Sequence, residues 1–313
     1  MVEKISIIGA GQVGRLISFL VLMRNLAREI LMVDIRKEMV QALSLDLEDS
    51  RFFFSSNTKV LATDDLTKIK SSQIIVITAG KPRSPGMSRE ELVKFNASLV
   101  KKIAKKIKKY APNSIVIVVT NPVDLMTYLV LKTTNFSKEK VIGMGSSLDS
   151  ARLANLISKR LNIDIRGISP VVLGAHGKNM LISRITSLYG LSLEGFLKKN
   201  IFQQIKKETI DRGAKIVSLL KEGSARFAPA SAVLRLLEAI IFDKKELIFC
   251  SVYLQGEFSL KNISLGVPVI VSKKGIEKIY AVSSDWPPVV RAFEYLGFKR
   301  DESEEIVYEK SLS

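Results

Sequence analysis

Ile5-Ser6-Ile7-Ile8-Gly9-Ala10-Gly11-Gln12-Val13-Gly14 is the stretch that decides the fold of this chain. A short apolar run leads directly into a Gly-x-Gly-x-x-Gly pattern, and a helical pattern follows. Glycines at this spacing allow a tight turn, a close approach of the backbone to a pyrophosphate, and close packing of the helix on the strand. Backbone N–H groups at the helix start can then hold the phosphates. The stretch predicts a dinucleotide site built by Gly9, Gly11, Gln12, Val13 and Gly14, with an ordinary glycine-rich loop as the alternative.

Asp34 strengthens this prediction. It ends the second apolar run, Leu31–Val33, at about the 20-residue spacing expected for the carboxylate that binds the adenosine ribose. A carboxylate accepts hydrogen bonds from a 2′-hydroxyl and repels a 2′-phosphate, so the position favours NAD over NADP. Arg36 nearby could weaken that preference, and Asp34 as a turn or cap residue is the alternative interpretation.

The first half of the chain, residues 1–145, alternates apolar runs of strand length with amphipathic segments. Continuous apolarity indicates strands that are covered on both faces, as in a parallel sheet with crossover helices. The pattern predicts a doubly wound α/β Rossmann domain. The predicted strands are Ile5–Ile8, Ile30–Val33, Ile74–Thr78 and Ile115–Thr120.

The second half, residues 146–313, has a different pattern and predicts an α+β substrate domain that packs against the first. Its short apolar runs carry turn signals on either side, which suggests antiparallel strands. The predicted helices are Leu148–Leu161, Phe202–Leu220 and Ala230–Phe242, and the predicted strands are Val171–Leu173, Ile248–Leu254 and Val267–Val271.

The composition is that of an ordinary globular protein with a strong basic excess. Of 313 residues, 47% are hydrophobic and 25% charged, and the net charge is +17. The lysines between positions 101 and 109 interleave with apolar residues, as on the outer face of an amphipathic helix. No stacking aromatics or nucleic-acid motif accompany them, so we expect no nucleic-acid partner. The positive field would help to attract an anionic substrate.

Three features predict a cytoplasmic protein with no membrane partner. A strand pattern begins at Lys4, which leaves no room for a signal peptide. The apolar run Leu16–Met23 is bounded by arginines and is too short to span a bilayer. Cys250, the only cysteine, cannot form an internal disulfide, which suits a reducing compartment.

His176 is the only histidine of the chain and lies within Gly174-Ala175-His176-Gly177. Flanking glycines and a preceding apolar run place it at a strand end, where sites tend to lie in α/β folds. Imidazole titrates in the range that reversible oxidation of a 2-hydroxy acid requires of a proton acceptor. A lone histidine is more often structural, and that alternative stays open on this residue alone.

Two further segments supply charged groups. Arg83 and Arg89 lie in and after a Pro/Gly-rich stretch that follows the third strand, a candidate for a lid; surface arginines are the alternative. Asn121 closes the strand Ile115–Thr120. Asp149 and Arg152 are separated by one helical turn and share a helix face, unless Asp149 is a plain N-cap and Arg152 a surface residue.

Together these segments resemble the lactate/malate dehydrogenase family, and more closely its bacterial and archaeal branch of lactate-dehydrogenase-like malate dehydrogenases. The likeness runs from about residue 4 to about residue 280, with the motifs in the family's order and spacing. It implies a Rossmann fold, NAD as the cofactor, a small dicarboxylate as the substrate, no metal, a place in the tricarboxylic acid cycle, and a homo-oligomer, either a dimer or a tetramer.

The resemblance also implies roles by position. His176 matches the proton acceptor, and Asp149 the carboxylate that orients its ring. Arg152 matches the arginine that binds the C1 carboxylate, and Arg89 the lid arginine that polarises the C2 carbonyl. Asn121 matches a residue that contacts both substrate and cofactor. Further positions match those that line the cofactor: Thr78, Ala79, Gly80, Asn96, Val119 and Thr120.

Arg83 decides the predicted substrate. In the family, arginine at this lid position goes with a second carboxylate and glutamine with lactate. Enclosing an unpaired guanidinium costs several kcal/mol, which a methyl group cannot offset. Ser224-Ala225-Arg226-Phe227-Ala228-Pro229 likewise resembles the malate enzymes' pocket wall. We therefore expect a malate enzyme, with L-lactate dehydrogenase and a catalytically silent NADH-binding protein as alternatives.

Two departures from the family pattern stand out. Lys178 replaces the usual aspartate two residues after His176, where it could depress the pKa of the histidine or point into solvent. The tail after Ile279 is foreign to the family's closing helix, since Trp286-Pro287-Pro288 interrupts it.

Overall fold

The computed structural model describes residues 1–81, 89–183, 185–221, 223–280, 299–300 and 308–309. Arg83 and nearly all of the atypical tail therefore lie outside the described residues. None of the described helices is both long enough and apolar enough to cross a bilayer.

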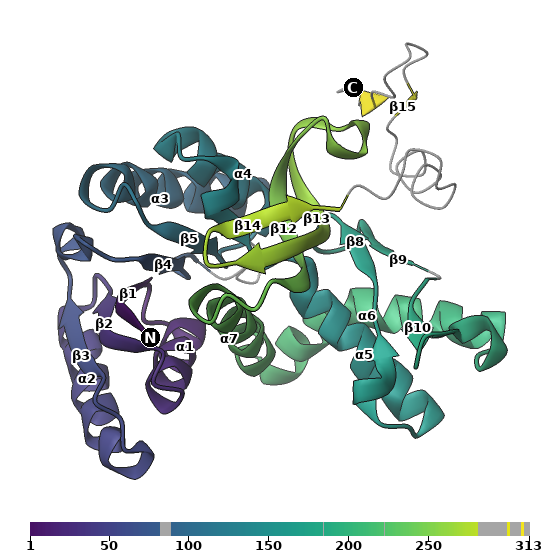
Figure 1. Cartoon of the computed structure of the whole chain (residues 1–313), viewed down its shortest axis with the longest axis horizontal. Coiled ribbons are helices and arrows are strands. Elements are labelled where there is room, and N and C mark those ends of the chain that lie inside the picture. The colour runs from purple at the N-terminus through teal and green to yellow at the C-terminus, as the bar shows by residue number, and fades with distance from the viewer. Residues whose placement is uncertain (82–88, 184, 222, 281–298, 301–307, 310–313) are drawn as a thin grey trace.

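A parallel sheet forms the centre of the first half, in the order β3-β2-β1-β4-β5-β6 (Figure 1). This is the doubly wound order that the glycine motif predicts. The strands are β1 (Val2–Ile8), β2 (Ala27–Val33), β3 (Lys59–Thr63), β4 (Ile74–Ile77), β5 (Ile115–Val118) and β6 (Val141–Gly143), and the helices between them are α1 (Gln12–Met23), α2 (Lys37–Ser50), α3 (Arg89–Tyr110) and α4 (Val123–Thr134).

Helices cover both faces of this sheet, which is why its strands are continuously apolar. In β4, Ile74 and Val76 pack on the side of α1 and α2, whereas Ile75 and Ile77 pack on the side of α3 and α4. Figure 1 shows α3 and α4 on one side of the strands and α1 on the other. The carboxyl ends of β1, β4 and β5 are thereby left for loops.

The second half extends the same sheet with antiparallel strands. β12 (Glu246–Gln255) joins β6 through the pair Ser251 and Gly143, and the order continues through β13, β8 and β9. These strands span β13 (Lys261–Ser272), β8 (Val172–Gly174) and β9 (Met180–Ile182), and β14 (Gly275–Ile279) pairs with β13. A small sheet, β11-β10-β7, contains β7 (Ile168–Ser169), β10 (Ser187–Leu188) and β11 (Leu191–Ser192), and β15 (Lys299–Arg300) pairs with β16 (Tyr308–Glu309).

The described part of the second half also contains the helices α5 (Ser146–Leu161), α6 (Lys199–Leu220) and α7 (Phe227–Ile241). α7 packs with α1 in the core of the first half, and α5 and α6 build a separate apolar cluster with β7–β10. Six short 3-10 segments lie between the main elements: η1 (Arg51–Phe54), η2 (Leu66–Ile69), η3 (Lys138–Lys140), η4 (Ile165–Gly167), η5 (Leu193–Gly195) and η6 (Glu257–Ser259).

The predicted fold class is confirmed, and each predicted helix and strand has a counterpart within a few residues of its expected limits. β3 and β6 of the first half were not predicted, nor were β7, β9, β10, β11, β14, β15 and β16 of the second half. β3 is an edge strand whose residues are only partly buried, and β6 has three residues.

Candidate active site

The glycine-rich loop has the backbone geometry that its sequence requires. Gly9 has a φ of +102°, and a Cβ at this position would lie 2.5 Å from the backbone nitrogen of Ala79. A Cβ at Gly14 would lie 1.9 Å from the carbonyl oxygen of Gly9. At Gly11, by contrast, no atom stands within 4 Å of the Cβ position. The outer glycines thus permit the fold, and Gly11 leaves open space beside the start of α1.

Asp34 connects the end of β2 to this loop. Its Oδ2 accepts a hydrogen bond of 2.8 Å from the backbone N–H of Ala10, and its Oδ1 accepts from the Arg36 backbone N–H and Nε, both at 3.1 Å. Burial raises the pKa of Asp34, but the bonds from Arg36 and Ala10 outweigh burial and leave the pKa below its usual value. The carboxylate is therefore ionised beside the glycine loop, with the Arg36 guanidinium lying over it.

The ends of β4 and β5 are joined by side chains of the predicted cofactor site. Thr78 Oγ1 donates to the Gly9 carbonyl at 2.6 Å, and Thr120 Oγ1 donates to the Ala79 carbonyl at 2.8 Å. At Gly80 a Cβ would lie 2.6 Å from the Thr120 side chain. These contacts bring the three predicted loops to one edge of the sheet.

Asn96 bonds the two loops that carry the other predicted cofactor residues. Its side chain is buried, Oδ1 accepts from the Lys81 N–H at 2.9 Å, and Nδ2 donates to the Asn121 carbonyl at 2.8 Å. Asn96 thus ties the loops after β4 and β5 together through their backbones. Val119 and Thr120 are also buried, whereas Asn121 is exposed.

Asp149 is the centre of the predicted catalytic group. It lies in the first turn of α5, is fully buried, and its Oδ2 is 2.6 Å from His176 Nδ1. Its Oδ1 accepts a hydrogen bond of 3.2 Å from Arg152 Nη1, one helical turn further on. The N-cap of α5 is Gly145 and not Asp149, so the plain N-cap alternative is wrong. One carboxylate thus holds an imidazole and a guanidinium side by side.

The environment favours the charged form of the imidazole. Burial lowers the pKa of His176, but the hydrogen bond and charge of Asp149 outweigh burial, so the pKa is raised above its ordinary value of 6.5. The charge of Asp124 adds to this rise and that of Arg152 opposes it. Because Asp149 occupies Nδ1, Nε2 is the nitrogen that can exchange a proton with a ligand.

Burial lowers the pKa of Arg152, Asp149 opposes this effect, and the nearby charge of Arg212 adds to it. The guanidinium also lies against α6, since a Cβ at Gly213 would be 3.4 Å from Arg152 Nη2. A buried guanidinium beside a proton-accepting imidazole is suited to bind a carboxylate next to a carbon that is being oxidised.

Comparisons with known proteins agree with this arrangement. Residues 3–143 match the family model for the lactate/malate dehydrogenase NAD binding domain, and residues 146–284 match that for the lactate/malate dehydrogenase alpha/beta C-terminal domain. The chain belongs to the lactate/malate dehydrogenase family.

Individual members of the lactate/malate dehydrogenase family are similar to this chain over nearly its whole length. The malate dehydrogenase of Flavobacterium johnsoniae is 39% identical over 283 residues, which cover 90% of this chain and 91% of the relative. The solved malate dehydrogenase of Cryptosporidium parvum has a TM-score of 0.88 at 34% identity and covers 94% of this chain and 96% of that one. The lactate dehydrogenase of the same organism, solved with lactic acid and nicotinamide adenine dinucleotide, has a TM-score of 0.86 at 32% identity and covers 95% of this chain and 96% of that one.

The family assignment and the NAD cofactor predicted from the sequence are thereby confirmed. The residues present fit that cofactor. The open space at Gly11, the N–H groups at the start of α1, and the ionised Asp34 carboxylate are the groups that a pyrophosphate and a ribose require.

Not every predicted residue of this family member can be placed. Arg83 lies outside the described residues, and Arg89 is the first residue of α3, with its side chain undescribed. Lys178 is exposed. This agrees with the second of its two sequence interpretations, a side chain that points into solvent.

Two contacts near the site were not predicted. Arg226, at the N-cap of α7, donates through Nη1 to Gln12 Oε1 at 3.0 Å and so reaches the first residue of α1. Asp124, the second residue of α4, accepts a hydrogen bond of 2.8 Å from the backbone N–H of His176. Asp124 follows the predicted site residue Asn121 closely, but a contact across 52 positions to a backbone atom leaves no pattern in the sequence.

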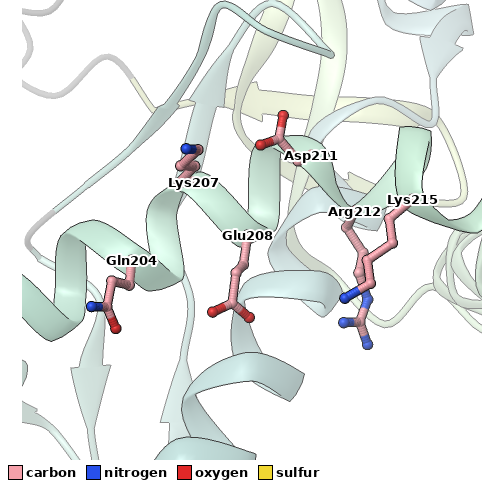
Figure 2. Close-up of a pocket in the computed structure, with 6 residues that line it drawn as sticks. All are labelled: Gln204, Lys207, Glu208, Asp211, Arg212 and Lys215. Carbon is pink, nitrogen blue, oxygen red and sulfur yellow. The ribbon is translucent and has the colours of Figure 1, made fainter.

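A surface pocket lies along α6. Figure 2 shows its lining side chains along this one helix, and Arg160 of α5 donates to two of them, Gln204 and Glu208. The lining residues are Gln204, Lys207, Glu208, Asp211, Arg212 and Lys215. No predicted catalytic, substrate or cofactor residue is among them, although the charge of Arg212 acts on Arg152.

Proposed function

We propose that this chain is an NAD-dependent malate dehydrogenase that interconverts (S)-malate and oxaloacetate. The observation that carries the proposal is the buried Asp149 carboxylate, which bonds His176 through one oxygen and Arg152 through the other. In a dehydrogenase of this family, that pairing supplies a proton acceptor and a carboxylate ligand in fixed relation. Relatives named malate dehydrogenase match about nine-tenths of the chain, which supports malate as the substrate.

Arg152, His176 and Asp149 each have a separate role in the proposed reaction. Arg152 binds the C1 carboxylate of malate, and His176 Nε2 accepts the proton of the C2 hydroxyl as C2 becomes a carbonyl. Asp149 stabilises the imidazolium that results, because its charge lies beside Nδ1. Bound NAD+ supplies the acceptor for the hydride that leaves C2. In the reverse direction His176 returns the proton to the C2 oxygen.

Three further roles are proposed from the resemblance. Arg89 polarises the C2 carbonyl, where negative charge develops as oxaloacetate is reduced. Asn121 contacts substrate and cofactor, and it is exposed at the end of β5, where a ligand can reach it. Arg83 pairs with the C4 carboxylate and so selects malate over lactate.

Steady-state reduction of oxaloacetate and of pyruvate by NADH tests the proposal. We expect oxaloacetate to be preferred by orders of magnitude, and Arg83→Gln to reduce that preference while leaving the affinity for NADH nearly unchanged. Turnover of pyruvate in preference to oxaloacetate would identify L-lactate dehydrogenase instead. NADH binding without turnover of either acid, unaltered by His176→Asn, would identify a silent nucleotide-binding protein.

We also propose that the protein is a cytoplasmic homo-oligomer with no nucleic-acid partner, and that its two domains meet at residues 145 and 146. A buried free Cys250 supports a reducing compartment. Phe52 and Phe53 on η1 are 85% and 80% exposed, and Leu45 on α2 is 63% exposed, which supports a second copy packing there. Sedimentation of the wild type and of a Phe52→Ser, Phe53→Ser variant tests this: identical masses for both would exclude that surface as the interface.

A further inference from the structure

A second carboxylate, Asp124, lies beside the predicted catalytic pair, and no step of the proposed reaction uses it. It occupies the first turn of α4, on a different element from Asp149. Its Oδ2 accepts the backbone N–H of His176 at 2.8 Å. This bond joins α4 to the loop that follows β8, which carries the imidazole. Glycines at 174 and 177 have φ values of +79° and +119°, so the loop turns sharply on both sides of His176.

The other oxygen of Asp124 is unusual. Oδ1 is buried and makes no hydrogen bond with any residue in the described ranges. Burial raises the pKa of the Asp124 carboxyl above its ordinary value, and the Ser251 hydroxyl of β12, the His176 backbone N–H and the charge of His176 oppose that rise. The charge of Asp124 also acts on the His176 ring, beside the backbone bond that holds the loop. The position therefore points to a role for the charge as well.

The charges around His176 come from several elements. Asp149 and Arg152 face it from α5, and Asp124 faces it from α4. Arg212 of α6 lies behind Arg152, and Lys178 on the same loop is exposed. The only positive charge acting directly on the ring among these groups is Arg152, so two carboxylates oppose one guanidinium.

We propose that Asp124 is a positioning residue for the catalytic imidazole: it anchors the backbone of His176 through Oδ2, and its negative charge helps the ring to hold a proton. The proposal deepens the proposed function, because it assigns a group that prepares His176 for proton transfer. Asp124 touches neither substrate nor cofactor in this role. It acts through the loop and through the field at the ring.

The two parts of the proposal can be separated by substitution. Asp124→Asn keeps an oxygen for the His176 N–H and removes the charge, whereas Asp124→Ala removes both. Asp164→Asn is the matched control, because Asp164 lies beyond the far end of α5, is exposed, and pairs locally with Arg166. Asp149→Asn provides the positive reference for loss of a charge that acts on the ring.

The single histidine allows a direct measurement that needs no substrate. NMR titration of protein labelled at histidine and free of any histidine tag reports only His176. We expect Asp124→Asn to lower the titration midpoint by about half a pH unit or more, since an opposite charge near a titrating group favours its charged form. Asp164→Asn should leave the midpoint unchanged. If Asp124→Asn also leaves it unchanged while Asp149→Asn lowers it, the charge of Asp124 has no part in holding the proton.

The anchoring part is tested by hydrogen exchange of the His176 backbone amide. We expect Asp124→Ala to accelerate exchange at least about tenfold at a pH where the protein stays folded, and Asp124→Asn to leave it near the wild-type rate. Equal protection in the wild type and in Asp124→Ala would overturn the anchor. If Asp124→Ala does not fold, Asp124→Asn still tests the charge, and Asp124→Ser, which keeps a shorter acceptor, replaces it in the exchange experiment.

These outcomes are independent of the proposed substrate. A wild type that reduces neither oxaloacetate nor pyruvate would refute the proposed function but would leave both NMR results interpretable. An active wild type with an unshifted Asp124→Asn titration and unaltered amide exchange in Asp124→Ala would refute only the role of Asp124. In an active enzyme, Asp124→Asn should also move the acidic limb of the pH profile in the same direction as the NMR midpoint.

Discussion

Asp149→Asn is the substitution that most directly tests the catalytic group. Asp149 Oδ2 lies 2.6 Å from His176 Nδ1, so in the native enzyme Nδ1 carries the hydrogen and Nε2 is free to accept a proton. An asparagine that keeps its oxygen toward Arg152 turns its N–H₂ toward Nδ1. The ring then takes the opposite tautomer, with hydrogen on Nε2, and cannot accept the hydroxyl proton.

The expected loss can be worked out from this geometry. The corresponding substitution in a serine-protease triad, which also imposes the wrong tautomer, lowers kcat by about 10⁴. Here Arg152 and the hydride acceptor remain, so we expect kcat for malate oxidation to fall by about 10³ to 10⁴, or roughly 4 to 5.5 kcal/mol in the activation free energy. The free energy of unfolding should fall by only about 1 to 3 kcal/mol, because the asparagine oxygen still accepts from Arg152 Nη1.

Steady-state malate oxidation, followed by nicotinamide absorbance, measures the effect. NADH affinity should stay within a few-fold of wild type, since Asp149 lies on α5 and the glycine loop on the other half of the chain. Asp164→Asn serves as the control for an unrelated charge loss. An Asp149→Asn enzyme that keeps kcat within threefold of wild type and the same pH profile would refute the catalytic pairing of Asp149 with His176.

The remaining predictions concern pH, the substrate carboxylate and the cofactor loop. The pKa of His176 is raised in the fold, so the native state binds more protons than the unfolded chain at pH values between the ordinary value of 6.5 and the raised one. The contribution of His176 to the free energy of unfolding is therefore full below 6.5 and is lost as pH rises through the raised pKa. His176→Asn should remove this pH dependence from urea titrations. Arg152→Gln should reduce kcat/KM for oxaloacetate by about 30- to 1000-fold, or roughly 2 to 4 kcal/mol, through loss of a charged carboxylate ligand, and an unchanged value in steady-state assays would contradict its role. Gly9→Ala should lower the free energy of unfolding by about 2 kcal/mol or more, since φ is +102° and the methyl group meets Ala79. Gly11→Ala, with open space around the Cβ position and a φ of −68°, should fold normally and lose NADH affinity in fluorescence titrations. Arg36→Ala should free the Asp34 oxygens and increase the ratio of NADH to NADPH affinity; a decrease would show that Arg36 does not contact a 2′-phosphate.

The sequence predicted most where a local pattern dictates the structure. Continuous apolar runs such as Ile74–Ile77 predicted covered parallel strands, and the glycine spacing predicted the first turn and its ligand. β3 was missed because an edge strand needs little burial and so resembles a loop in composition. β6 was missed because three residues carry no periodicity, although Val141–Gly143 joins the two halves of the sheet.

The site residues were predicted by type and order, and so was the pairing of Asp149 with His176, but other contacts between distant segments were not. Asn96 was predicted as a residue that lines the cofactor, but the bonds of its amide to the backbones of two loops were not predicted. The bond from Arg226 to Gln12 and that from His176 to Asp124 join positions far apart in the chain. Such contacts depend on how the sheet brings loop ends together, and no spacing rule along the sequence encodes them. The roles of Arg83 and Arg89 stay predictions, because Arg83 and the side chain of Arg89 lie outside the described residues.

The shared carboxylate at Asp149 makes proton transfer and substrate binding interdependent. When His176 gains a proton, the Asp149 carboxylate stabilises the imidazolium and stabilises the Arg152 guanidinium less. When His176 is neutral, the Asp149 charge stabilises mainly Arg152, whose pKa is lowered by burial. A substrate carboxylate bound at Arg152 supplies the missing negative charge and so favours protonation of His176 in turn. A dicarboxylate should therefore raise the pH at which His176 titrates in a dead-end complex, and Arg152→Gln should abolish that rise. If ligand binding leaves the His176 titration midpoint where it is in the free enzyme, the two functions of Asp149 are not coupled.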